Sequence, residues 1–123
     1  MGADIKSYRD LLVWQQAMDL AVGCYKLSKK FPKEDLFGLT SQLRRSSASV
    51  AANIAEGHGR ESSATFIQYL RISQGSLKET ETHIILAGQL ELGSKQELKL
   101  ALASCDEIGK MLRSLIRAIQ DKK

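Results

Sequence analysis

The sequence predicts an all-α fold, in which residues 1–123 form a single domain built as a four-helix bundle. The chain holds only one proline, and it is rich in residues that lose little freedom in a helix, such as alanine, leucine, glutamate and lysine. Apolar residues recur every three or four positions in four separate stretches. Short turn-forming segments separate these stretches, so an antiparallel up-and-down arrangement is expected.

The first two helices have recognisable boundary residues. The four predicted helices cover about residues 10–29, 34–57, 63–91 and 95–120. Asp10 is an N-cap for the first helix, although a capping box of Ser7 with Asp10 would start it earlier. Pro32 interrupts the apolar pattern and suits the first turn of the second helix. That helix is expected to end at Gly57 or Gly59, where a glycine can adopt a left-handed conformation.

The third and fourth helices are delimited by serine and glycine. Ser62 or Ser63 is expected to cap the third helix, and Gly93 to close it. Ser94 with Glu97 three residues later makes a capping box for the fourth helix. Two seams of alternating three- and four-residue steps then predict the core faces. They consist of Phe66, Leu70, Ser73, Leu77, Thr80 and Ile84, and of Leu98, Leu102, Cys105, Gly109, Leu112, Ile116 and Ile119.

Apolar residues on the first and third helices extend beyond what a single bundle needs to bury. The first helix has two adjacent rows, Leu11, Trp14, Met18, Ala21 and Tyr25 beside Val13, Ala17, Leu20, Cys24 and Leu27. The third helix places Ile72, Gly75 and Leu86 opposite its seam. A lone bundle would present charge on these surfaces. We therefore expect neighbouring copies of the chain to cover them.

The second helix, with the segment QLRRSSASVAANIAEG, has three distinct faces. The core face is expected to hold Leu36, Leu39, Leu43, Val50 and Ile54, flanked by small side chains at Ala48, Ala51 and Ala55 and by a polar stripe of Gln42, Arg45, Ser49, Asn53 and Glu56. Arg45, Asn53 and Glu56, together with Glu79 or Glu81 of the third helix, are candidates for a structural polar network. Buried charges are tolerated only when paired, so a structural role is favoured over a catalytic one.

No catalytic or metal-binding constellation is evident, so we expect a non-enzymatic protein without a metal or cofactor. Glu79 and Glu81 are two residues apart and point to different sides of a helix. A di-iron bundle needs paired Glu-x-x-His motifs, whereas Glu79 and His83 are one residue too far apart and have no second copy. Cys24 and Cys105 lie in separate apolar patterns, which favours buried free thiols over a disulfide or zinc site.

The charge of the chain is uneven. The net charge is +4, and basic residues concentrate in the C-terminal run from Lys110 to Lys123, while residues 63–109 are mildly acidic. The candidate nucleic-acid-binding residues are Arg44, Arg45, Arg60, Lys110, Arg113 and Arg117. Lys110, Arg113 and Arg117 share one side of the fourth helix and could hold phosphate groups. The alternative is that they complement the dipole at the C-terminal end of that helix.

The N-terminal residues and the apolar stretches bear on localisation. The segment MGADIKSYRD has no apolar region like that of a secretory signal. No stretch approaches the roughly 20 apolar residues that a membrane span requires. We therefore expect a cytoplasmic protein that does not bind membranes.

Several segments resemble one protein family. They are YRDLLVW (8–14), FPKE (31–34), LTSQLRR (39–45), SVAANIAEG (49–57) and GSLKETE (75–81). Together they resemble the signature segments of the 23S rRNA-intervening sequence proteins, over nearly the whole chain. The resemblance also extends to the accessory variability protein of diversity-generating retroelements, a basic bundle that associates with a reverse transcriptase and nucleic acid. It implies a four-helix bundle that assembles as a homopentameric ring.

Two hypotheses of function follow. The first is a non-enzymatic oligomeric protein that binds RNA, or a partner that processes nucleic acid, through a basic surface. A ring repeats each basic patch by symmetry and so multiplies a modest charge per chain. The alternative is a structural scaffold or protein-interaction module with no nucleic-acid role. The sequence alone identifies neither the RNA nor the partner.

Overall fold

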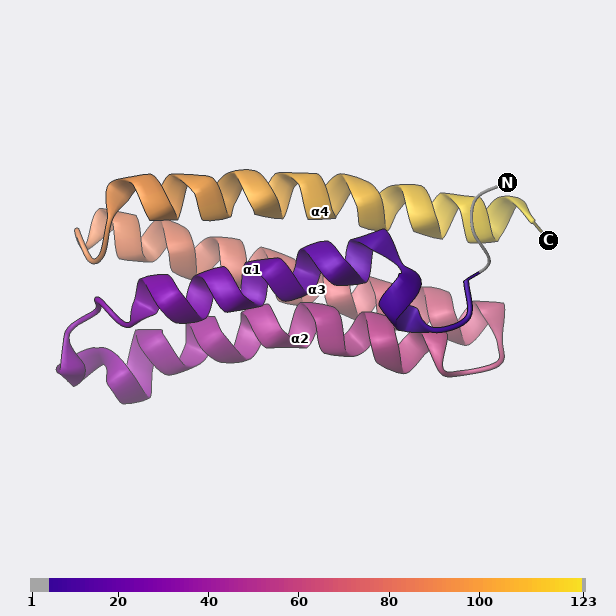
Figure 1. Ribbon diagram of the computed structural model, residues 1–123, viewed down its shortest axis with the longest axis horizontal. Coiled ribbons are helices and arrows are strands. Elements are labelled where there is room, and N and C mark those ends of the chain that lie inside the picture. Colours follow the sequence, from indigo (N-terminus) through magenta and orange to yellow (C-terminus); the bar gives the residue numbers. More distant parts are fainter. Residues whose placement is uncertain (1–4, 123) are drawn as a thin grey trace.

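The computed structural model describes residues 5–122, which form four long helices (Figure 1). The helices are α1 (Leu12–Ser28), α2 (Ser41–His58), α3 (Ser63–Gln89) and α4 (Lys95–Asp121). No strand occurs in this part of the chain, so the all-α prediction is confirmed. The colours in Figure 1 run in opposite directions along successive helices. Each helix packs against the next in sequence, and α1 also packs against α4. None of the described helices is long and apolar enough to cross a membrane.

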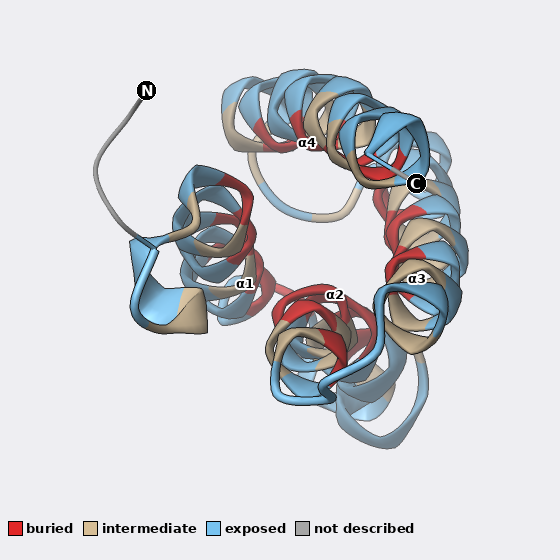
Figure 2. Ribbon diagram, turned by 90° about the vertical axis from the view of Figure 1, so that its right-hand side faces the viewer, coloured by how far each residue is buried: buried red, intermediate tan, exposed pale blue. Residues whose placement is uncertain are grey.

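The core lies along the central axis of the bundle, where the buried faces of the four helices meet (Figure 2). Leu43, Val50 and Ile54 of α2 are fully buried, as predicted. The core faces predicted for α3 and α4 are also buried or half-buried. Of the two apolar rows predicted on the first helix, only the row from Val13 to Leu27 is buried throughout. The helical spacing of apolar residues therefore located the core.

The chain enters α1 through a short turn and not through one continuous helix. The Ser7 hydroxyl accepts from the Arg9 amide at 3.0 Å, and the Asp10 carboxylate accepts from the Ser7 amide at 3.1 Å. This capping box closes a 3₁₀ turn, Tyr8–Asp10. Leu11 then adopts an extended conformation, with φ −76° and ψ 123°. The predicted start at residue 10 was wrong because the cap belongs to this separate turn, and α1 begins at Leu12.

The start of α2 differs most from the prediction. After Pro32 the chain forms a 3₁₀ turn, Lys33–Asp35, and a π-helical turn, Leu36–Thr40. Gly38 within that turn has non-helical angles, φ −114° and ψ −111°. A residue without Cβ is the usual occupant of such a conformation. The helical phase is lost across this kink, so α2 begins at Ser41 instead of residue 34.

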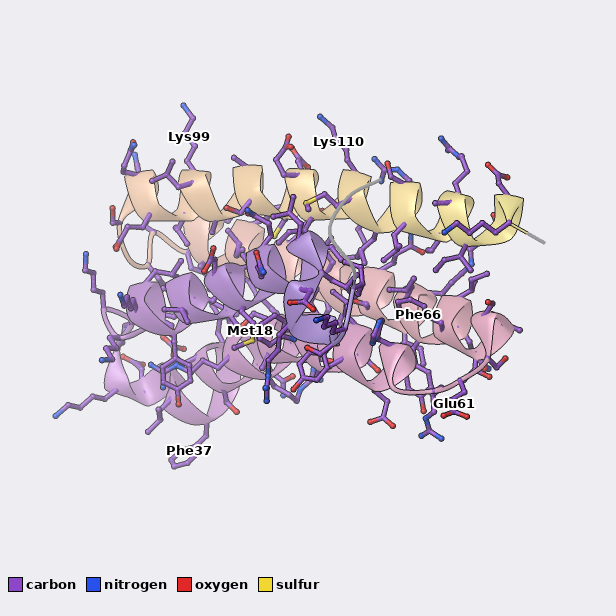
Figure 3. The ribbon with its side chains drawn as sticks, turned by 45° about the vertical axis from the view of Figure 1, so that its right-hand side comes forward. Met18, Phe37, Glu61, Phe66, Lys99 and Lys110 are labelled. Carbon is purple, nitrogen blue, oxygen red and sulfur yellow. The ribbon has the colours of Figure 1, made fainter. Side chains whose placement is uncertain are left out.

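The kink turns two apolar residues outward. Leu36 was predicted to lie in the core but is 45% exposed, because 100° per residue does not hold across the π-helical turn. Phe37 is 93% exposed and projects from one end of the bundle (Figure 3). The first predicted core residue that turns inward is therefore Leu39, which is half-buried and lies in the π-helical turn before α2.

Gly57 does not end α2 in a left-handed turn. The helix continues to His58, and Gly59 has φ −72° and remains right-handed. Gly57 is buried where α2 crosses α3, and a Cβ placed there would lie 2.5 Å from the Cβ of Tyr69. The glycine is thus required by the close approach of two helices and not by a turn.

The connection from α3 to α4 contains the left-handed residues. The third helix ends at Gln89, two residues before its predicted end, and Glu91 and Gly93 have φ values of 59° and 70°.

Serines cap the N-terminal ends of α3 and α4. Ser62 accepts a hydrogen bond from the Thr65 amide and Ser94 accepts one from the Glu97 amide, each at 3.3 Å. Only this half of the predicted capping box forms. The Glu97 carboxylate instead pairs with Lys30 Nζ at 2.8 Å, which ties α4 to the end of α1.

Removing the Ser94 cap should destabilise α4. We expect Ser94→Ala to lower the free energy of unfolding by about 1 kcal/mol, because an amide at the start of the helix loses its acceptor. The measurement is urea unfolding followed by circular dichroism at a fixed chain concentration. The control is Ser114→Ala, the same change at an exposed position inside α4. It should leave stability unchanged or slightly raised, and an equal loss in both variants would exclude a capping role.

Candidate nucleic-acid interface

Small polar side chains form part of the contact between α2 and α3, the most extensive contact between any two helices. The bonds are Thr80 Oγ1 to Ser46 Oγ (3.0 Å), Ser49 Oγ to Ser76 Oγ (2.9 Å) and Ser73 Oγ to the Val50 carbonyl (2.8 Å). Short hydroxyl side chains let two helices approach closely while their polar atoms remain satisfied. Ser49 of the polar stripe and the neighbouring Ser46 therefore face α3.

The candidate polar network forms at one point between the helices. The Arg45 guanidinium pairs with the Glu79 carboxylate across α2 and α3, and it also donates to Gln42 Oε1 at 2.9 Å. His83 Nε2 lies 3.6 Å from the same carboxylate, on the half-buried side of α3. The Arg45–Glu79 pair is partly exposed, so its electrostatic contribution to stability is small.

The other three members of the candidate network make local contacts. Asn53 Nδ2 donates to Ser49 Oγ at 2.9 Å, one turn earlier on α2. Glu56 pairs with Arg60 at 2.7 Å, and Glu81 pairs with Lys78 at 3.3 Å. Asn53 thus joins the hydroxyl contacts indirectly, whereas Glu56 and Glu81 do not meet the Arg45–Glu79 pair.

Arg44 is held between α1 and α2. Its Nε donates to Ser28 Oγ at 2.9 Å, and its guanidinium carbon lies 4.0 Å above the ring centroid of Tyr25. Arginine combines a donor fork with a flat face that stacks on aromatic rings. Arg44 is therefore engaged within the bundle.

Two further candidate cations have carboxylate neighbours. Arg60 donates to Glu56 at 2.7 Å and to the Tyr69 hydroxyl at 3.2 Å, and the bond to Glu56 raises the pKa of the Arg60 guanidinium. Lys110 Nζ lies 3.6 Å from Glu107 Oε2 and projects from α4 away from the bundle (Figure 3). Each carboxylate reduces the positive charge that its partner offers to an anion.

The remaining candidates, Arg113 and Arg117, line a shallow groove between α3 and α4. The groove has a volume of about 180 Å³, and its lining consists of Arg71, Gln74, Arg113, Ile116, Arg117 and Gln120. No carboxylate lines it. Within residues 5–122, no ion pair includes any of these three arginines. Three arginines and two glutamines therefore line the same groove.

Arg71 was not among the predicted site residues. It lies on α3, more than 40 positions from Arg113, and only the packing of α3 against α4 brings the two together. Periodicity assigns residues to faces of one helix but does not pair faces across helices. The mildly acidic character of residues 63–109 also concealed this arginine.

Potential metal ligands and the two cysteines were the other chemical groups of interest in the sequence. No group of three or more His, Cys, Asp or Glu residues in 5–122 could hold a metal ion. Cys24 and Cys105 are free and buried. Burial raises the pKa of Cys24 to about 11 and that of Cys105 to about 12, so both thiols stay protonated and poorly nucleophilic at neutral pH.

The comparisons with known proteins agree with this architecture. No curated protein matches the chain. A crystal structure from Bacteroides thetaiotaomicron VPI-5482, described as a protein of unknown function from the S23 ribosomal protein family, superposes with a TM-score of 0.76 at 29% sequence identity. The match covers 85% of this chain and 98% of that one. Residues 9–114 match the family model of the 23S rRNA-intervening sequence protein. The chain belongs to the 23S rRNA-intervening sequence protein family.

Proposed function

We propose that the chain is a non-enzymatic binding protein of the cytoplasm that holds RNA, or a partner that processes nucleic acid, on a basic surface. In this proposal up-and-down bundles assemble into a ring, as the family resemblance implies, and each copy contributes one α3–α4 groove. The observation that carries the proposal is the groove itself, in which Arg71, Arg113 and Arg117 converge without a carboxylate. Phosphate backbones are the common polyanion that such a surface attracts.

Exposed apolar residues support the assembly. Met18, Val22 and Tyr25 share one side of α1, and each is between 39% and 54% exposed. Ile72 and Leu86 lie on α3 opposite its seam and are 49% and 42% exposed. Aligned apolar surfaces of this kind mark protein contacts. A closed ring would repeat every basic groove around its axis and strengthen the field that each RNA meets.

The test is RNA affinity as a function of salt. We expect binding of a labelled RNA oligonucleotide, measured by fluorescence polarisation, to weaken steeply as salt increases. Arg113→Glu/Arg117→Glu should lower the affinity for RNA by about tenfold or more for each chain that contacts the RNA. The slope of log affinity against log salt concentration should fall by about 2, since two phosphate contacts are lost. Both side chains are exposed, so the fold should persist.

A matched control is available on the same helix. Lys95→Glu/Lys99→Glu makes the same change in charge at the same spacing, at the opposite end of α4. Lys99 projects away from the bundle (Figure 3). This variant should lose little affinity. If both variants lost the same RNA affinity, the net charge of the chain alone would account for binding. If neither variant lost affinity, the groove would not be the RNA-binding surface.

The exposed Phe37 favours the second candidate function, a protein-interaction module. Exposure of 93% of a phenylalanine side chain to water is energetically unfavourable, and binding of an apolar partner surface would cover it. In this case a partner protein would co-purify after nuclease treatment and at high salt. Phe37→Ser should then release that partner while RNA affinity stays unchanged.

A further inference from the structure

We infer that the α3–α4 groove is a defined phosphate-binding site and not only part of a diffuse positive surface. Its donors are the guanidinium groups of Arg71, Arg113 and Arg117 and the side-chain amides of Gln74 and Gln120. The inference rests on the proposed function for the source of the phosphate, the RNA backbone. The donor chemistry itself requires only a phosphate group.

The grouping of cations is unfavourable in the absence of an anion. Arg113 and Arg117 are four residues apart on α4, a spacing at which like charges destabilise a helix. Arg71 adds a third positive charge from α3. Helix polarity does not account for the pair, because the last turn of α4 contains no basic residue and the dipole effect fades beyond that turn. A bound anion would remove the repulsion.

The residue types also suit phosphate. Arginine presents donors in a planar fork that matches two phosphate oxygens, whereas lysine is a point charge. The amide groups of Gln74 and Gln120 can donate to the remaining oxygens without adding charge. Ile116 is almost fully buried and closes the base of the groove against the core.

A glycine in the middle of α4 lies beside one of these groups. Glycine inside a helix costs about 1 kcal/mol relative to alanine. A Cβ at Gly109 would lie 3.6 Å from Arg113 Nη1 and 3.6 Å from Leu77 Cδ2 of α3. The Arg113 guanidinium thus lies back along α4 beside α3, in space that a longer side chain at Gly109 would fill.

The experiment separates a phosphate site from a diffuse field by keeping the charge constant. Arg71→Lys/Arg113→Lys/Arg117→Lys retains three positive charges but removes the forked donors. Gln74→Leu/Gln120→Leu leaves the charge untouched and removes two amides. The probes are inorganic phosphate, adenosine 5′-monophosphate and an RNA oligonucleotide, with sodium chloride at matched ionic strength as reference. The readouts are arginine Nε–H chemical shifts and RNA polarisation, and circular dichroism verifies the fold of each variant.

In the wild-type chain we expect arginine shifts that saturate with phosphate at millimolar concentration, and none with chloride. The lysine variant should lose this saturation and bind RNA about fivefold to tenfold more weakly. The leucine variant should weaken phosphate binding with an unchanged salt slope. Tighter binding of RNA than of the two small probes would assign the site to the backbone, because neighbouring phosphates engage repeated grooves. Equal binding would assign it to a free phosphate ligand.

The failures of the two proposals are distinguishable. If the lysine variant binds RNA and phosphate like the wild type, while Arg113→Glu/Arg117→Glu loses RNA, the diffuse surface stands and the phosphate site is overturned. If the arginine shifts of the wild type saturate with phosphate but RNA does not bind, the phosphate site is supported and the proposed RNA-binding function is contradicted. Shifts that rise linearly with phosphate would overturn the site.

Discussion

Replacing Gly57 by alanine is expected to destabilise the bundle by about 2 kcal/mol. The new Cβ would lie 2.5 Å from the Tyr69 Cβ, 3.1 Å from Phe66 Cδ1 and 3.3 Å from the Phe66 carbonyl oxygen. Carbon atoms pack at about 3.5–4.0 Å, so α2 and α3 must separate here. Such overpacking costs about 1–3 kcal/mol and outweighs the gain in helix propensity, which is at most about 1 kcal/mol.

Gly23→Ala is the control for this change. It makes the same substitution inside α1, where nothing lies within 4 Å of the added carbon. We expect it to stabilise the chain by about 0.5–1 kcal/mol. Both variants are compared by thermal and urea unfolding at one chain concentration, because stability of an oligomer depends on concentration. If Gly57→Ala were as stable as Gly23→Ala, the close crossing of α2 and α3 would be wrong.

Met18→Glu/Val22→Glu is expected to dissociate the proposed ring into single chains. Both side chains are exposed in the single bundle, so the double change should not disturb the core. In an assembly, each copy would bury two new carboxylates against an apolar surface, and burial of unpaired charge is strongly unfavourable. Sedimentation velocity should therefore show a shift to the single-chain species with unchanged helicity.

A variant with the same two added carboxylates elsewhere makes the comparison specific. Lys95→Glu/Lys99→Glu places them on exposed positions of α4, outside the apolar row of α1. It should keep the mass of the wild-type assembly. A Met18→Glu/Val22→Glu chain that retains that mass would show that this side of α1 is not a contact surface.

The local patterns were sufficient for most of the fold. Spacing placed Leu43, Val50 and Ile54 in the core, and Ser94 was recognised as the cap of α4. The predictions were wrong where the backbone departs from a regular α-helix and where a residue is determined by a contact with another helix. The π-helical turn before Ser41 displaced Leu36 from the core, because no sequence period signals a change in helical phase. Gly57 was predicted to mark a turn, whereas the structure has a glycine there because α3 passes too close for a Cβ.

Only part of the candidate site could be predicted from the sequence. Arg113 and Arg117 could be identified from their spacing on one helix, but Arg71 joins them only through the packing of α3 against α4. Arg44 and Arg45 looked equally available, yet each is engaged by groups on a neighbouring helix, Ser28 and Tyr25 on α1 and Glu79 on α3. Lys123, part of the basic C-terminal run, lies outside the described residues. Charge can be counted from a sequence, whereas its neutralisation depends on tertiary neighbours.

The molar mass of the wild-type chain in solution tests the central proposal most directly. Multi-angle light scattering at micromolar concentration should give several times the 13.6 kDa of one chain, and about five times that value for the proposed homopentameric ring. A single species of 13.6 kDa across the concentration range would contradict the assembly, and the repeated positive grooves with it.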